Sequence, residues 1–167
     1  MRKIRKSESA DLPEILEIFA RARERMAEEG NAAQWITYPG REVIMRDIEL
    51  GQSYVITDDG EITGTFVFFS GEEPDYRVID GRWLSDGPYG VIHRIAGDGE
   101  HRGILRSATD FAFSHVSSIR VDTHEKNRSM RAALGRLGFS ECGTVYISDD
   151  SGPDSPRIAY QKMKEAD

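Results

Sequence analysis

Apolar residues in the first part of the chain follow the spacing of one helix face, through Ile15, Ile18, Phe19, Ala22 and Met26. Pro13 suits the first turn of such a helix, because its missing amide donor costs little there. Ser9 or Asp11 is a suitable N-cap, and Gly30 is a suitable end. The pattern therefore predicts a helix that ends near Glu29.

The next apolar runs alternate as strands do. Ser53–Thr57 and Ile62–Phe69 are strand-like and are separated by Asp59-Gly60, which is typical of a β-hairpin. A second helix is expected over Arg41–Leu50, and a short edge strand over Arg2–Lys6. A hairpin preceded by two helices is thus predicted for the first 70 residues.

The second half alternates strands with helices after a polar loop over residues 70–87. The expected elements are a strand Tyr89–Ala96, a helix Ile104–Val116, a strand Ile119–Thr123, a helix Ser129–Leu137, and strands Cys142–Ser148 and Arg157–Lys162. Hairpins at both ends and strand–helix alternation between them predict a mixed α/β sheet. No repeat or second domain is evident, so residues 1–167 are expected to form one domain.

Composition narrows the class of protein. The chain has 167 residues, of which 38% are apolar and 31% charged, as in a soluble globular domain. It has no apolar run of the ~20 residues that a membrane helix needs, and MRKIRKSES lacks the apolar stretch of a secretory signal. The single cysteine, Cys142, excludes an internal disulfide, so a cytoplasmic setting is expected.

The net charge of −7 argues against general nucleic-acid binding, which requires clustered basic residues. It is compatible with a cationic small molecule or an amine acceptor, although net charge specifies no substrate.

A glycine-rich turn, GDGEHRGILRS, follows the expected strand that ends at Ala96. Gly97, Gly99 and Gly103 permit backbone shapes in which amides converge on an anion, and the following helix offers its positive end. Arg102 and Arg106 are suited to screen a diphosphate. A plain strand-to-helix turn explains the glycines equally well. A dinucleotide-binding turn fits less well, because the third glycine comes one position late.

The stretch from Gly90 to Ile147 resembles the GNAT superfamily of N-acetyltransferases. The family's Arg/Gln-x-x-Gly-x-Gly/Ala motif aligns on residues 100–105, with Gly103 matching and Glu100 and Leu105 departing from it. A register that begins at Arg102 is the alternative. The later segment matches better: Asp-Thr-His at 122–124, then Asn127, then Gly138-Phe139, a pattern that is similar to a bacterial subgroup.

The resemblance implies a central mixed, partly splayed sheet flanked by about four helices, with acetyl-CoA as cosubstrate and no metal. It implies a splay between the strands Tyr89–Ala96 and Ile119–Thr123. The residues expected to bind the cofactor are Ile95, Ala96, Gly97, Arg102, Gly103, Ile104, Leu105, Arg106 and Asn127. The family's tyrosine acid has no counterpart, because Leu134 occupies its position.

Candidates for proton transfer lie on the same expected strands. His93 is the first candidate base, because it titrates near neutral pH, and a buried structural histidine is the alternative. Tyr89 could order a water, and Tyr146 is a candidate acid or a core aromatic. Asp122 and His124 are expected on one strand face, where an Asp–His pair could relay a proton. The alternative is that Asp122 caps a loop and His124 is an exposed histidine. His93, Asp122 and His124 could together form a metal site, but they lack the close spacing that metal ligands usually have in sequence.

Gln34, Trp35, Tyr38 and Trp83 are candidates to line an acceptor pocket, or to form a satellite core. The expected activity is direct acetyl transfer from acetyl-CoA to a primary amine of a small molecule or peptide. The alternatives are a non-catalytic CoA-binding or ligand-sensing module and an enzyme for longer acyl groups. The two C-terminal strands offer a surface for a homodimer.

Overall fold

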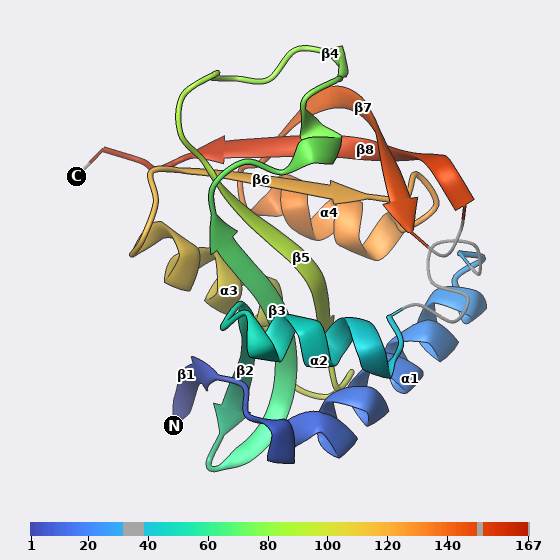
Figure 1. Ribbon diagram of the computed structural model, residues 1–167, viewed down its shortest axis with the longest axis vertical. Coiled ribbons are helices and arrows are strands. Elements are labelled where there is room, and N and C mark those ends of the chain that lie inside the picture. Colours follow the sequence, from blue (N-terminus) through green and yellow to red (C-terminus); the bar gives the residue numbers. More distant parts are fainter. Residues whose placement is uncertain (32–38, 150–151, 167) are drawn as a thin grey trace.

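An eight-stranded mixed sheet forms the centre of the protein (Figure 1). The computed structural model describes residues 1–31, 39–149 and 152–166, and no side chains at 149 and 152–154. Within these residues the strand order is β1-β2-β3-β5-β6-β8-β7-β4. All neighbouring strands pair antiparallel except β5 and β6, which are parallel. The mixed α/β sheet expected from the sequence is therefore confirmed.

The elements of the first half are β1 (Arg2–Lys6), η1 (Ser9–Asp11), α1 (Leu12–Glu28), α2 (Arg41–Glu49), β2 (Ser53–Asp58) and β3 (Glu61–Ser70). Those of the second half are η2 (Pro74–Tyr76), β4 (Asp80–Gly81), β5 (Gly90–Gly97), α3 (Ile104–Phe113), β6 (Ser118–Thr123), α4 (Arg128–Arg136), β7 (Ser140–Asp149) and β8 (Gly152–Met163). The four helices and the main strands agree with the sequence-based expectation, apart from their ends. The segment 70–87 was wrongly expected to be only loop, since it contains η2 and β4.

The start of α1 differs in detail from the expected cap. Asp11 does occupy the N-cap position, but its carboxylate does not accept from the helix amides. It instead accepts from the amide of Glu8 at 2.7 Å and forms an ion pair with Arg5 at 2.8 Å. The side chain therefore ties α1 to β1.

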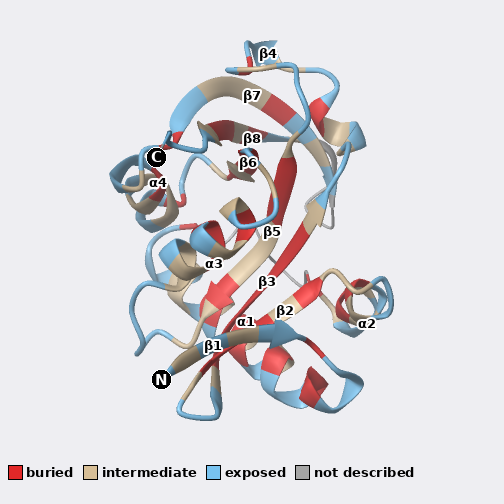
Figure 2. Ribbon diagram, turned by 90° about the vertical axis from the view of Figure 1, so that its left-hand side faces the viewer, coloured by how far each residue is buried: buried red, intermediate tan, exposed pale blue. Residues whose placement is uncertain are grey.

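Helices lie on both sides of the sheet (Figure 2). The apolar faces of α1 and α2 pack on one side, around Phe19, Ile44 and Val55. On the other side α3 and α4 pack over a core that includes Phe66 and Leu134. No helix in the described part of the chain is long and apolar enough to span a membrane.

The two halves of the sheet separate between β5 and β6. These strands pair only at Gly90↔Ile119 and Val91↔Arg120. Beyond these two pairs they diverge, as the oblique course of β5 relative to β6 shows (Figure 1). The expected splay is confirmed, and from Ile92 onward the edge of β5 that faces β6 has no ladder partner in the part of the chain that the structure describes.

A backbone irregularity in β5 lies next to this splay. The register between β3 and β5 shifts between Thr65 and Val67, and Arg94 has a φ of +46°. A left-handed conformation is strained for a residue with a Cβ and is concentrated at functional sites. Strict alternation predicts His93 and Arg94 on opposite faces of the strand. That expectation is wrong, because both line one cavity.

Candidate active site

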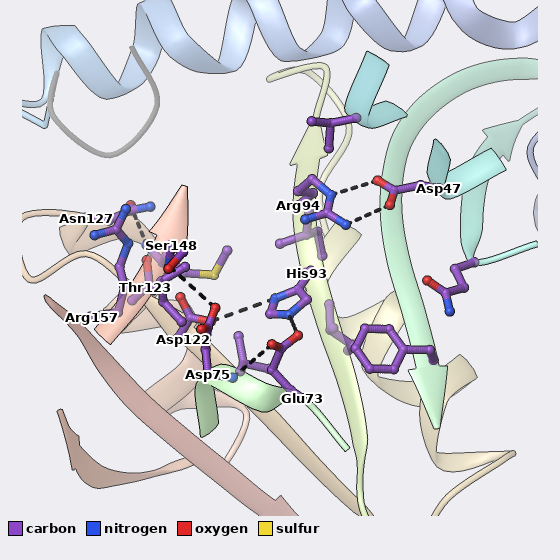
Figure 3. A pocket seen from close by; sticks show the side chains of 18 of the residues that line it. Asp47, Glu73, Asp75, His93, Arg94, Asp122, Thr123, Asn127, Ser148 and Arg157 are labelled. Atoms are coloured by element: carbon purple, nitrogen blue, oxygen red, sulfur yellow. Dashed lines mark hydrogen bonds and ion pairs between the residues drawn. The ribbon is translucent and has the colours of Figure 1, made fainter. Parts of the chain in front are cut away.

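A cavity of about 660 Å³ lies where β5 separates from β6. Figure 3 shows His93 and Arg94 of β5 on one side of it, and Asn127, Ser148 and Arg157 on the other. Its size is within the ordinary range for small-molecule sites, about 300–1,000 Å³. The lining combines charged side chains with apolar ones from α1, α2, β5, β6 and α4.

His93 lies between two carboxylates in this cavity (Figure 3). Its Nε2 is 2.9 Å from Oε2 of Glu73, whereas its Nδ1 is 3.8 Å from Oδ2 of Asp122. Only the first distance is that of a hydrogen bond. A neutral ring that donates from Nε2 to Glu73 therefore keeps the lone pair of Nδ1 available on the Asp122 side.

Two tyrosines, the buried Tyr76 and the half-buried Tyr89, hold the residues that carry these carboxylates. The Tyr76 hydroxyl donates to Oδ2 of Asp122 at 2.6 Å, and the Glu73 amide donates to the Tyr89 hydroxyl at 2.9 Å. Burial and the Asp122 charge raise the pKa of Tyr76 well above its ordinary value, so Tyr76 remains a neutral donor. Trp83 donates from its indole nitrogen to the Tyr76 carbonyl.

The acidic groups of the cluster respond differently to burial. Burial raises the pKa of Glu73, but the hydrogen bond and charge of His93 outweigh it and the net shift is downward. Burial, reinforced by the charges of Glu73 and Asp122, raises the pKa of Asp75. No Lys, Arg or His nitrogen lies within 4 Å of the Asp75 carboxylate in the described part of the chain. Carboxylates thus outnumber nearby cations around His93.

Arg94 of β5 is held by an ion pair with a carboxylate of α2. Its Nε and Nη2 donate to the two carboxylate oxygens of Asp47 on α2, at 2.7 and 2.8 Å. Asp47 is buried, and two parallel charge-assisted hydrogen bonds fix the guanidinium plane. This pair stabilises the strained backbone that directs His93 into the cavity. The helical periodicity of residues 41–50 did not indicate that Asp47 would form it.

A second hollow of about 240 Å³ adjoins the first. Met26, Ile95, Asn127 and Met130 line both, so the two form one continuous groove between β5, α1, α3 and α4. The Thr123 hydroxyl is buried at the divergence of β5 and β6 and has no hydrogen-bond partner among the described residues. Together with the unpaired edge of β5, it offers polar groups to an extended amide-containing chain.

The glycine-rich turn opens α3 at the end of this groove. Gly103 is the N-cap with a φ of +77°, which favours glycine there. The first helical hydrogen bond runs from Ser107 to Gly103, so the amides at 104–106 have no acceptor within the helix. Gly97 is also required, since a Cβ there would be 2.9 Å from Cγ1 of Ile104. These features suit a diphosphate.

Charged residues beside the turn partly oppose each other. Asp98 accepts from the amides of Glu100 and His101 at 2.9 and 2.8 Å, so two loop amides are already engaged. Burial raises the pKa of Asp98, but these amides and His101 lower it more, and the carboxylate stays charged. Arg25 of α1 donates to the Gly97 carbonyl at 2.7 Å and brings a cation that the sequence analysis did not identify.

Most of the expected cofactor residues line the groove. Ile95, Ala96, Gly97, Ile104, Leu105 and Asn127 do so. Arg102 and Arg106 are exposed on the loop and the first turn of α3. Asn127 is the buried N-cap of α4, where its side chain accepts from the Met130 amide at 3.2 Å.

The other expected site residues are more scattered. Tyr89 and Trp83 lie beyond the His93 cluster and line a different cavity. Tyr146 is exposed and donates to Asp80, and it lines neither part of the groove. His124 accepts from the Lys126 amide through Nδ1 instead of pairing with Asp122, which contacts Tyr76 and His93. Gln34, Trp35 and Tyr38 lie outside the described residues.

No family model matches the chain, and no curated protein matches it in sequence. Solved structures do match. A GNAT-family acetyltransferase from Streptococcus agalactiae 2603 is 33% identical over 99% of this chain and 96% of its own, with a TM-score of 0.88. One from Listeria monocytogenes 4b F2365 is 22% identical (97% and 94% covered, TM-score 0.68).

The ribosomal-protein-S18-alanine N-acetyltransferase of Escherichia coli is 16% identical over 100% of this chain and 97% of its own, with a TM-score of 0.61. At this identity, as for the Listeria protein, the likeness concerns the fold. The streptococcal protein, with 33% identity over nearly the full length of both chains, resembles this chain in sequence as well as in fold. The chain therefore belongs to the GNAT family of acetyltransferases.

Proposed function

We propose that the protein transfers an acetyl group from acetyl-CoA directly to a primary amine of a small molecule or peptide. The observation that carries the proposal is the position of His93, at the point where the splayed groove opens into the cavity. A base at this junction would face both the incoming amine and the thioester. The fold supports acyl transfer as the class of reaction, and His93 is the proposed base for it.

The groove supports acetyl-CoA as the donor. Acetyl-CoA supplies the activated thioester. The amides at 104–106 suit its diphosphate, and the free edge of β5 with Thr123 suits the amide-containing arm. A β5 amide that donates to the thioester oxygen would stabilise the negative charge that develops there during transfer.

His93 is the candidate general base. Nδ1 would accept a proton from the attacking amine, because Nε2 is engaged by Glu73. Glu73 and Asp122 would stabilise the positive charge that the ring then acquires, and Glu73 also fixes its orientation. Both carboxylates are positioning residues in this scheme.

The acidic lining supports an amine as the acceptor. Asp75 and Asp122 face the cavity beside His93, and Asp75 has a raised pKa that a bound cation would relieve. The charged form of an amine would be attracted to this cluster, and its neutral form would react after losing a proton to solvent or to His93. Cys142 lines neither part of the groove, and burial raises the pKa of its thiol, which favours direct transfer over a covalent intermediate.

The test combines calorimetric titration of acetyl-CoA with a thiol-release assay. The acceptors are an alkyl monoamine, a diamine of equal length, a carboxylate-bearing amine and a peptide with an N-terminal alanine. Saturable binding with amine-dependent thiol release is expected, faster for the diamine than for the carboxylate-bearing amine. Absence of acetyl-CoA binding by the folded protein would contradict the proposal.

A non-catalytic CoA-binding module is the second candidate, and one observation favours it. Leu134, at the position of the family's tyrosine acid, is fully buried in the core. Among the described residues, no tyrosine lines either part of the groove. Binding of acetyl-CoA without turnover on any acceptor would support this candidate. An enzyme for longer acyl groups would need a wider pocket near Leu134, and Leu134 lines neither part of the groove.

A further inference from the structure

A separate cavity of about 1040 Å³ lies at the other end of β5. It is enclosed by the segment 70–89, the turn at 115–117 that follows α3, and β6. It shares no lining residue with the acetyl-transfer groove. Its base is formed by aromatic side chains and one buried arginine, Arg120 of β6.

Arg120 is only 5% exposed, and no carboxylate of the described residues pairs with it directly, although the charge of Asp86 acts on it from beyond 4 Å. The guanidinium carbon lies 4.1 Å from the Trp83 ring centroid and 3.9 Å from that of Tyr89. Nη2 donates to the Ser85 carbonyl at 2.7 Å. The buried Nε has no acceptor, and no carboxylate oxygen lies within 4 Å of the guanidinium in the described part of the chain.

The burial of this group is energetically unfavourable without an acceptor. A buried donor left without a hydrogen bond is not compensated for the loss of its water, and this cost is larger when the group carries a charge. Stacking on two rings offsets part of that cost, but it provides no acceptor for the Nε–H. An anionic ligand would provide both an acceptor and a counter-charge that lies closer than Asp86.

The other charges of the cavity limit the ligand to a single negative charge. Arg77 and Glu72, both exposed, form an ion pair at 2.7 Å and together add no net charge to the cavity. Asp86 is exposed at the rim, where it would repel a dianion such as phosphate. Pro88 and Val116 add apolar surface beside the aromatic base. We propose that this cavity binds a small monocarboxylate with a planar apolar body, whose carboxylate pairs with Arg120.

The bound carboxylate would lie close to groups that order the His93 cluster. Tyr76 and Tyr89 both line this cavity, and their hydroxyls contact Asp122 and the Glu73 amide. Occupancy would therefore stabilise the segment that carries Glu73. This consequence for turnover rests on the proposed function, whereas binding itself does not.

The test uses benzoate as the probe and benzamide as its uncharged isostere, with calorimetric titration of the full chain. Benzoate is expected to bind saturably, and benzamide about tenfold or more weakly, because it lacks the charge that pairs with Arg120. Arg120→Lys should weaken benzoate by a similar factor, since Lys is one point charge without the planar fork.

A second variant covers the case in which Arg120→Lys fails to fold. Ser117→Phe adds bulk at an exposed position on the cavity wall and should abolish benzoate binding. The matched control is Ser148→Phe, an exposed serine on the wall of the other cavity, which should leave benzoate binding intact. Equal affinity for benzoate and benzamide, no binding by the folded protein, or loss only in Ser148→Phe would each overturn the proposal.

Discussion

The glycine-rich turn and the His93 cluster lie at two ends of one groove but are built in opposite ways. The turn is continuous in sequence, from Gly97 to the first turn of α3, and presents mainly backbone groups. The cluster joins side chains from η2, β5 and β6, which are up to 49 residues apart in the chain (122 − 73). A binding surface made of amides tolerates changes of side chain, whereas proton transfer depends on individual groups held in place. Substitutions in the two regions should therefore affect different kinetic constants.

The largest effect is expected for His93→Gln. Loss of the general base should lower kcat for the amine by about a hundred- to ten-thousand-fold. The dissociation constant of acetyl-CoA should stay unchanged, because His93 is not among the groups that line the cofactor end of the groove. Thiol release and calorimetry measure the two quantities.

Tyr146→Phe is the control for this substitution, since Tyr146 is exposed and bound to Asp80. It should leave kcat unchanged. If His93→Gln retained full turnover, the assignment of the base would be wrong and the contrast between the two regions would disappear.

The next largest effect is expected for Asp47→Ala. The substitution leaves Arg94 without its buried carboxylate partner, and breaking such a pair costs about 3 kcal/mol or more. It should also lower kcat more than it raises KM for acetyl-CoA, because the Arg94 backbone positions His93. Urea denaturation and steady-state kinetics measure both effects.

Glu49→Ala on the same helix is the matched control. Glu49 is exposed, and such surface substitutions change stability by about 0.5 kcal/mol or less. Equal losses for the two variants would show that the ion pair contributes nothing specific.

Gly103→Ala is expected to act on the cofactor end instead. A Cβ at Gly103 meets only ordinary contact, 3.4 Å from Arg2 Nη1, so the cost is conformational. A left-handed residue other than glycine costs about 1–2 kcal/mol. KM for acetyl-CoA should rise while kcat at saturation stays nearly constant, since the amides at 104–106 would shift.

Gly135→Ala provides a control of opposite sign. Gly135 lies in the last turn of α4, has no positive φ and has no described atom within 4 Å of its would-be Cβ, so alanine should stabilise by about 0.5 kcal/mol. Thermal unfolding of both variants tests the prediction. A Gly103→Ala protein as stable as the wild type would contradict the conformational argument.

The same contrast explains how far the sequence alone could lead. The helices, the hairpin and the glycine-rich turn were predicted because apolar spacing and turn residues are local signals. His93 was identified as a candidate, but Glu73 and Tyr76 were missed because they lie in a segment that reads as polar loop. Their role appears only when η2 packs against β5 and β6.

The irregularity at Arg94 was also beyond sequence reasoning. Strand alternation gave the wrong face, because a bulge paired with a positive φ is stabilised by Asp47 on a helix 47 residues away in sequence. Arg25 was overlooked for a similar reason, since its contact with Gly97 spans 72 residues. Arg94 and its direct neighbours, His93 and Ile95, are neither proline nor glycine, so no local signal marked the bulge at this position.

The smallest expected effect is an acid-dependent loss of stability where β1, β2 and α3 meet, beside the glycine-rich turn. Asp58 accepts from Arg2 at 2.9 and 3.0 Å, and Arg2 also donates to Ser107 of α3 at 3.1 Å. Hydrogen bonds from Arg2 and Thr63 lower the pKa of Asp58 to about 2. Because the folded pKa is depressed, the stabilisation is fully present above about pH 4, the ordinary value for Asp, and is lost as the pH falls toward 2.

The full shift would correspond to roughly 2.5 kcal/mol, but both side chains are partly exposed, at 20% and 25%, and solvent screening reduces it to about 1 kcal/mol. Asp58→Asn should remove this component, so the stability of wild type and variant should converge between pH 4 and pH 2. Denaturant midpoints across that range measure the difference. A constant gap down to pH 2 would mean that the Arg2–Asp58 pair does not supply the acid-sensitive link between β1, β2 and α3.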